Sequence, residues 1–555
     1  MTAVLATRTR TPAAAKGGEF TGTASLLRLA LRRDRVRATA WVLGVAVFVY
    51  SQAAPLKNLY PTQADLDDLA RAYGSGVNPG LVAITGPPRA LNTYGGATAW
   101  QVLTFAAVLL ALMSYLLVLR HTRAEEETGR SDLLDAAPVG RYARLAAALL
   151  HVGLLNALIL VLGLAALLSV GGIPFGGSLA LMAACVSVGL VFAAVGAVAA
   201  QLTEHARSAG GIAGAVLGAA FLLRAAGDSA AVNGSSGRWL SWLSPIGWAE
   251  EVRPYAGDRW AVLLVPAVAV GLLLVAVGVL RARRDAGAGV VRSRPGPAGA
   301  PSTLSGPLGL AWRLQRGSIL GWAIGAAIGG AVFGGLAQDM VTAANDDPNT
   351  AEMLREYTGA GGSLADVYLG MIYLVMGMVV AGYAVAAALR LRTEEESHRA
   401  EPVLATAVSR VRWAGAHVVW VVVGSAVILA SSGLLAGLAH GLRTDAVGTE
   451  VSRQLGAALA QLPAVLVLAA VAVALFGVAP RFTLLSWAVL LLAIVIGQFG
   501  EILRLPSAVM DLSPFTHLPK LPGADVTATP YLGLLTLSAA LTAAGLAGFR
   551  RRDLG

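Results

Sequence analysis

Long uncharged apolar runs recur along the whole chain and constrain its fold more than any other feature. A bilayer core about 30 Å thick is crossed by about 20 residues of helix, and we count about twelve runs of that kind. Their approximate limits are 38–56, 99–119, 145–170, 178–202, 209–223, 261–280, 318–338, 367–389, 414–438, 455–478, 482–500 and 529–548. Only 13% of residues are charged, against about 25% in soluble domains. The sequence therefore predicts an all-α polytopic membrane protein.

The distribution of basic residues predicts which side of the membrane each loop occupies, because Lys and Arg are retained in the cytoplasm. If the N-terminus is inside and the loops alternate, about 30 of the 42 Lys and Arg residues lie on the cytoplasmic side. We therefore expect both termini in the cytoplasm of a bacterial plasma membrane. The net charge of +10 then reflects this orientation and contact with anionic membrane lipids, with no nucleic-acid partner.

Two signatures repeat in one register. The first acidic motif, RAEEETGR at residues 123–130, aligns without gaps with the second acidic motif, RTEEESHR at 392–399, at an offset of 269. The same offset pairs the Leu-Ser-Pro sequence at 243–245 with that at 512–514. We therefore expect two tandem parallel six-helix repeats. The predicted divisions are a disordered cytoplasmic leader at 1–24, a first half at 25–285, a cytoplasmic Gly/Pro/Ala linker at 286–306 and a second half at 307–555.

Each acidic motif lies between the second and third spans of its half, on the predicted cytoplasmic side. If the motifs are helical, side chains four residues apart form ion pairs. The expected pairs are Arg123 with Glu127, Glu126 with Arg130, Arg392 with Glu396 and Glu395 with Arg399. A single acidic run is usually a solvated loop, but two acidic runs in one register on a basic face favour a docking surface for a soluble partner.

At these residues the chain resembles permeases of the type-2 ATP-binding-cassette exporters, in particular the fused twelve-span actinobacterial kind described as polyketide antibiotic exporters. The resemblance covers nearly the whole chain. It implies an amphipathic helix before the first span of each half, at 25–41 and 306–317, and a re-entrant element before each sixth span. It also implies cytoplasmic coupling helices that dock on an ATPase. Their residues would be Arg123, Glu125, Glu126, Glu127 and Arg130, with Arg392, Glu394, Glu395, Glu396 and Arg399. In the alignment Gly129 corresponds to His398 and Pro138 to Ala407, so the two docking surfaces need not be equivalent.

No nucleotide site is apparent in this chain. A phosphate-binding G-x-x-x-x-G-K-[ST] loop needs a lysine, and the three lysines, Lys16, Lys57 and Lys520, stand in no such sequence. We therefore expect a permease that is not itself an enzyme and holds no cofactor. ATP and Mg²⁺ would bind in a separate ATPase, with two copies per chain.

The segment 238–260 is rich in Trp and interrupted by Pro245, a composition typical of the membrane interface. It is either a loose interfacial loop or a re-entrant hairpin. The repeated Leu-Ser-Pro sequence favours the hairpin and a role as an outer gate. The gate residues would be Trp242, Ser244 and Pro245, with Ser513 and Pro514 in the second half.

Few polar side chains lie inside the predicted spans. His151, Asn156 and Gln498 are the candidates for a translocation path, although His151 would equally bond a neighbouring helix. An otherwise apolar interior suits hydrophobic small molecules or lipids as cargo. No metal-ligand cluster or catalytic triad is apparent, and the single Cys185 is interpreted as a packing residue.

Two other functions fit parts of the sequence. A proton-coupled secondary transporter of the major-facilitator kind also has twelve spans, but it has a basic loop between spans two and three and needs acids deep in its spans. A membrane-embedded enzyme acting on lipids would need metal or base partners for its loop acids, and none is apparent here.

Overall fold

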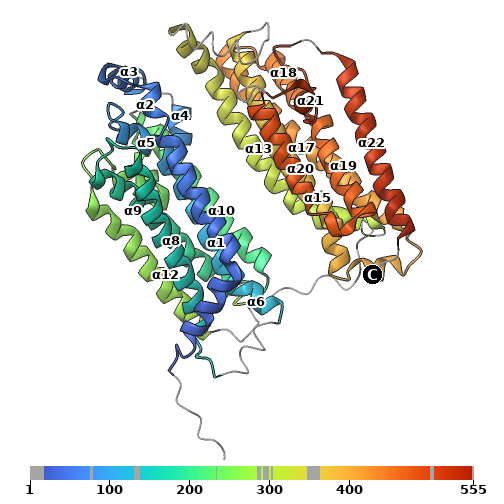
Figure 1. The fold of residues 1–555 in the computed structure, drawn as a ribbon, viewed down its shortest axis with the longest axis horizontal. Helices are drawn as coiled ribbons and strands as arrows, with labels where there is room; N and C mark the ends of the chain where they lie inside the picture. Colours follow the sequence, from blue (N-terminus) through green and yellow to red (C-terminus); the bar gives the residue numbers. More distant parts are fainter. Residues whose placement is uncertain are drawn as a thin grey trace, which may run out of the picture. The chain divides into compact units, whose positions relative to one another are not determined.

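The computed structural model describes residues 18–74, 79–129, 138–232, 234–283, 289–291, 299, 301, 304, 306–346, 363–500, 505–524 and 526–552. Every regular element in these ranges is a helix, and 11 helices are long and apolar enough to cross a membrane. The predicted all-α polytopic class is confirmed. The chain divides into two compact units, Met1–Pro295 and Gly296–Gly555 (Figure 1).

Each predicted span except one coincides with a helix of spanning length. The exception is 482–500, where the helix covers only the 15 residues of α20 (Leu485–Phe499). Pro480 begins a short 3₁₀ turn, η4 (Pro480–Phe482), so the apolar run starts as a turn and the helix begins later. Residues 501–504 lie outside the described ranges.

Unit 1 is a helical bundle with α5 and α9 at its centre. Its elements are α1 (Thr23–Ala53), α2 (Leu56–Leu59), α3 (Gln63–Gly74), α4 (Pro79–Thr85), α5 (Tyr94–His121), α6 (Arg123–Glu127), α8 (Ala143–Ser169), α9 (Phe175–Leu202), α10 (Ala206–Val232), η1 (Ser236–Leu243), α11 (Pro245–Glu251), η2 (Trp260–Leu263) and α12 (Leu264–Ala282). In the most apolar 18 consecutive residues of the helices that contain α5 and α9, 72% are buried, against 11% in the helix that contains α12. The exposed apolar face of α12 is suited to lipid contact.

Unit 2 is a second helical bundle. Its elements are α13 (Pro307–Asp346), α15 (Leu364–Glu396), α16 (Ala400–Leu404), α17 (Arg410–Thr444), α18 (Val447–Leu459), α19 (Leu462–Val478), η4, α20, α21 (Ser507–Met510) and α22 (Ala528–Arg551). The predicted span 455–478 lies within the spanning stretch Val447–Val478, in which a turn at 460–461 separates α18 from α19 and Pro463 stands in the first turn of α19. Helices α19 and α22 cross at glycines: a Cβ added to Gly477 would lie 1.8 Å from the backbone oxygen of Gly545. This close approach requires small residues.

The amphipathic segments expected before the first span of each half are not separate helices. Residues 25–41 form the first part of α1, and 307–317 form the first part of α13. Each basic stretch therefore continues directly into its apolar span as one helix.

Candidate functional site

The first acidic motif forms α6, a five-residue helix that follows α5 after a break at Thr122. Arg33 of α1 donates to Glu125 at 2.5 Å, from Nη1 to Oε1. Arg123, whose side chain is 1% exposed, donates to Glu126 at 2.5 Å. Two of the three glutamates are thus neutralised within unit 1, and α6 is held against α1.

Glu127 connects α6 to α10. Its Oε2 accepts from the backbone nitrogen of Ala206, the first residue of α10, at 3.0 Å, and its Oε1 lies 3.3 Å from Nδ1 of His205. A carboxylate at the N-terminus of a helix interacts favourably with the helix dipole. The Glu127 side chain remains 44% exposed, the largest exposure among the three glutamates of this motif.

The second acidic motif begins as the last turn of α15. Glu394 lies 3.3 Å from Arg390, and Glu395 accepts from Nη2 of Arg552, at the end of α22, at 2.5 and 2.6 Å. The Arg552 guanidinium also lies over the rings of Phe476 and Phe549. Glu394 and Glu395 therefore both pair with arginines of unit 2.

Three of the predicted helical ion pairs are tested by the described residues. The pair of Arg392 with Glu396 is confirmed at 2.8 Å. The pair of Arg123 with Glu127 is wrong, because α6 is a single turn in which Arg123 contacts Glu126 while Glu127 contacts α10. Arg130 lies outside the described residues, so its pair with Glu126 stays a prediction.

The predicted pair of Glu395 with Arg399 is also wrong. Helix α15 ends at Glu396, and His398 has a left-handed backbone with φ of 55°, so Arg399 no longer stands one turn beyond Glu395. Arg399 instead lies 4.0 Å from Glu394 and is 64% exposed. Glu396, at 60%, is the most exposed glutamate of this motif.

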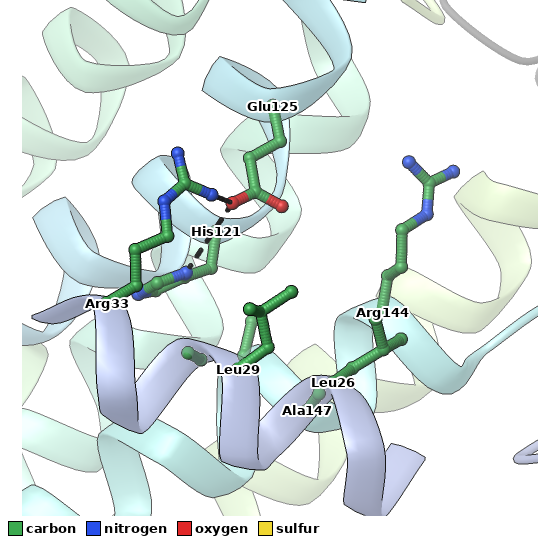
Figure 2. A pocket seen from close by; sticks show the side chains of 9 residues that line it. Leu26, Leu29, Arg33, His121, Glu125, Arg144 and Ala147 are labelled. Carbon is green, nitrogen blue, oxygen red and sulfur yellow. Dashed lines mark hydrogen bonds and ion pairs between the residues drawn. The ribbon is translucent and has the colours of Figure 1, made fainter. Parts of the chain in front are cut away.

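Beneath the first acidic motif lies a buried cluster of Asp34, His121 and His151 from α1, α5 and α8. Oδ2 of Asp34 lies 2.6 Å from Nε2 of His121 and 3.9 Å from Nε2 of His151. A pocket opens beside His121, lined by Arg33, Glu125 and apolar residues of α1 and α8 (Figure 2). The sequence analysis selected only His151, because the three residues come from separate helices and share no spacing.

The predicted gate residues of the first half form a structured turn. Ser244 is buried and caps α11, its Oγ accepting from the backbone nitrogen of Ile246 at 3.2 Å, and Pro245 opens that helix. Trp242 lies in η1 and is 44% exposed. In unit 2 the equivalent Ser513 instead donates to the backbone oxygen of Ala493 at 2.9 Å, and Pro514 starts no helix. The two Leu-Ser-Pro sequences therefore have different local structures.

A buried ionic cluster, which the sequence analysis missed, fixes the position of α11. Arg224 of α10 is fully buried and lies 3.4 Å from Glu250 of α11 and 3.5 Å from Asp228. It also donates to backbone oxygens of α4, including that of Ala83 at 2.8 Å. Burial, together with the neighbouring Asp228 carboxylate, raises the pKa of Glu250 well above its usual range despite Arg224.

The pKa of Glu251, the next residue, shifts in the opposite direction. Burial by itself raises the pKa of Glu251, but the guanidinium groups of Arg89 and Arg253 outweigh burial and hold the pKa below its usual range. Arg89 donates to Glu251 at 2.7 Å and so ties the segment before α5 to α11.

Of the predicted translocation residues, His151 and Asn156 lie in α8 of unit 1 and Gln498 lies in α20 of unit 2. Asn156 is fully buried and donates from Nδ2 to Ser114 of α5 at 3.0 Å, so it links α8 to α5. A Cβ added to Gly189 of α9 would lie 2.3 Å from Oδ1 of Asn156. Gln498 lies near the end of α20 in unit 2, with its Oε1 buried and not hydrogen-bonded.

The fold and composition define a multi-pass helical protein of the bacterial plasma membrane. Residues 304–550 match the family model of the C-terminal domain of the multidrug efflux system permease Rv1217c. Over 540 residues the chain is 42% identical to the multidrug efflux system permease protein Rv1217c of Mycobacterium tuberculosis (strain ATCC 25618 / H37Rv), covering 97% of this chain and 96% of the relative. The chain therefore belongs to the family of this efflux permease.

Proposed function

We propose that this chain is the membrane-spanning permease subunit of an ATP-driven exporter that moves hydrophobic, drug-like molecules or lipids outward. The observation that carries the proposal is the 42% identity, over almost the full length of both chains, to a multidrug efflux system permease. In this proposal the type-2 ATP-binding-cassette architecture applies: two parallel six-span halves, a cytoplasmic link and both termini in the cytoplasm.

The acidic motifs are the proposed docking sites for the ATPase. Each motif offers one well-exposed glutamate, Glu127 or Glu396, while its other glutamates are bound to basic side chains of the same unit. An exposed charge on a braced segment gives orientation to a docking partner. Two motifs correspond to two ATPase copies per chain, which would bind ATP and Mg²⁺.

The bracing contacts also supply a route for mechanical coupling. A pull on α6 would act on α1 through Arg33 and on α10 through Ala206. A pull on the end of α15 would act on α22 through Arg552. Closure of the two ATPases would then tilt the helices of each half and move cargo from the cytoplasm or inner leaflet outward.

Energy dependence distinguishes this proposal from a proton-coupled transporter. Cells that produce the chain with a cognate ATPase are loaded with a hydrophobic fluorescent dye, and dye efflux is followed. Efflux should persist with a protonophore while ATP is maintained, and stop when ATP is depleted. Efflux that stops with the protonophore at constant ATP would support the proton-coupled alternative.

A further inference from the structure

The cluster of Asp34, His121 and His151 has the composition of a metal site. Its three ligand atoms, Oδ2 and two imidazole nitrogens, lie within 4.8 Å of one another, and all three residues are buried. Two imidazoles and a carboxylate form the ligand set of three-residue zinc sites, in which a water takes the fourth position. Mg²⁺ and Ca²⁺ prefer oxygen ligands, so this set favours a transition metal.

His151 supplies an independent indication. Its side chain is 0% exposed, and neither ring nitrogen has a hydrogen-bond partner. Buried polar groups almost always form hydrogen bonds, so a buried imidazole without a hydrogen-bond partner indicates that a ligand binds there. Its Nε2 faces Oδ2 of Asp34 at 3.9 Å, on the side where His121 also lies.

Neighbouring charged groups are arranged as the outer shell of a metal site. Arg120 donates to Oδ1 of Asp34 at 3.0 Å, which leaves Oδ2 facing the histidines. Nδ1 of His121, the nitrogen opposite the metal-facing one, lies 3.9 Å from Oε1 of Glu125 (Figure 2). A carboxylate behind a histidine is the usual outer partner of a zinc ligand. Glu125 is held in place by Arg33.

In the ion-free geometry Nε2 of His121 is hydrogen-bonded to Oδ2 of Asp34 at 2.6 Å, and a bound ion would replace this hydrogen bond. Ligand atoms about 2.0–2.1 Å from a tetrahedral ion are about 3.3 Å apart. The observed separations of 2.6 and 3.9 Å lie on either side of that value. The third separation, between the two imidazole nitrogens, is at most 4.8 Å, and the ring centroids are 5.0 Å apart.

Unit 2 lacks the same ligands. The motif offset of 269 aligns His121 with Arg390 and His151 with Trp420, and residues 32 and 35 correspond to 313 and 316, which aligns Asp34 with Gln315. Gln315 lies 3.3 Å from His417, so that region of unit 2 holds one imidazole and no carboxylate ligand of this set. Among the described residues, the ligand set of Asp34, His121 and His151 therefore occurs in unit 1 alone.

We propose that Asp34, His121 and His151 bind one divalent transition-metal ion of the zinc class, joining α1, α5 and α8 beneath the first acidic motif. The inference goes beyond the proposed export function and does not depend on it.

Metal binding is tested on the full chain, purified in mild detergent through a tag without histidine and stripped with a chelator. Titration with Co²⁺ should give the intense visible absorption of tetrahedral coordination at one ion per chain, reversed by Zn²⁺. His151→Ala and Asp34→Asn should abolish it, and Glu125→Gln should weaken binding about 10- to 100-fold. The matched control His417→Ala, another buried histidine, should bind as the unchanged chain does.

The proposal is overturned if the unchanged chain binds no stoichiometric Co²⁺ or Zn²⁺, or if His151→Ala binds equally well. If a variant does not fold, X-ray absorption on the unchanged chain still tests the assignment. X-ray absorption of the Zn²⁺-loaded protein should show two imidazole nitrogens with oxygen neighbours. A shell of oxygen alone, or one with sulfur from Cys185, would contradict the assignment.

Discussion

Glu127 and Glu396 are the third glutamates of the two acidic motifs, and each is the most exposed glutamate of its motif, at 44% and 60%. The other four glutamates are between 7% and 15% exposed. A soluble partner that recognises these motifs would therefore meet one acidic side chain in each. The remaining acids hold the motifs to their own helices.

Charge reversal at the exposed pair should impair export without unfolding the protein. We expect Glu127→Lys with Glu396→Lys to reduce dye efflux at least tenfold. The lysines would repel the basic surface that is expected to dock on the glutamates, and like charges at a docking surface cost several kcal/mol. The melting temperature in detergent should fall only slightly, because the lost contacts of Glu127 with the start of α10 and of Glu396 with Arg392 are partly exposed. The control is Glu19→Lys, an exposed glutamate outside both acidic motifs. Equal loss of efflux in the control would mean that general surface charge, and not the motif, is responsible.

Removal of Arg552 should destabilise unit 2. Arg552→Ala leaves the Glu395 carboxylate, 10% exposed, without its closest partner and removes the cation from two aromatic rings. Breaking a largely buried pair of this kind costs about 3 kcal/mol. Reversible unfolding in detergent measures the loss. Arg399→Ala, at an exposed arginine, should cost less than about 0.5 kcal/mol; a similar loss at both positions would refute the assigned pairing.

Asn156 is expected to act in helix packing. Gly189→Ala would place a Cβ against Oδ1 of Asn156 and should destabilise the fold by about 1–3 kcal/mol. Asn156→Ala in the same chain should recover part of that loss, since it removes the clashing atom. Melting temperatures of the single and double variants test this coupling. Strictly additive losses would show that the two side chains do not meet.

The pH dependence of stability should include a contribution from Glu250. Because its folded pKa is raised by burial, the folded protein binds this proton more tightly than the unfolded chain does. That stabilisation is present below the ordinary pKa of 4.5 and is lost as the pH rises through the raised folded value. Glu250→Gln, which resembles the protonated carboxyl, should flatten the decline in melting temperature with rising pH. An unchanged profile in this variant would contradict the shift.

The sequence predicted the helices well because a bilayer imposes a length and a composition on each span. It failed where partners come from distant helices. Arg399 was expected to pair with Glu395 from spacing alone, whereas the partner, Arg552, is 157 residues away. The same limit hid the cluster of Asp34, His121 and His151 and the burial of Arg224 against Glu250. The repeated Leu-Ser-Pro sequence likewise did not ensure a repeated structure, since Ser244 caps a helix and Ser513 bonds to α20.

The most direct test of the central claim is co-purification of the full chain, in mild detergent, with candidate ATP-binding-cassette ATPases from the same genome, beginning with any encoded beside it. The account predicts two ATPase copies per chain, ATP turnover raised by the permease, and loss of both in the Glu127→Lys, Glu396→Lys variant. Failure of every candidate to bind, or binding and turnover unchanged by that variant, would contradict docking at the acidic motifs.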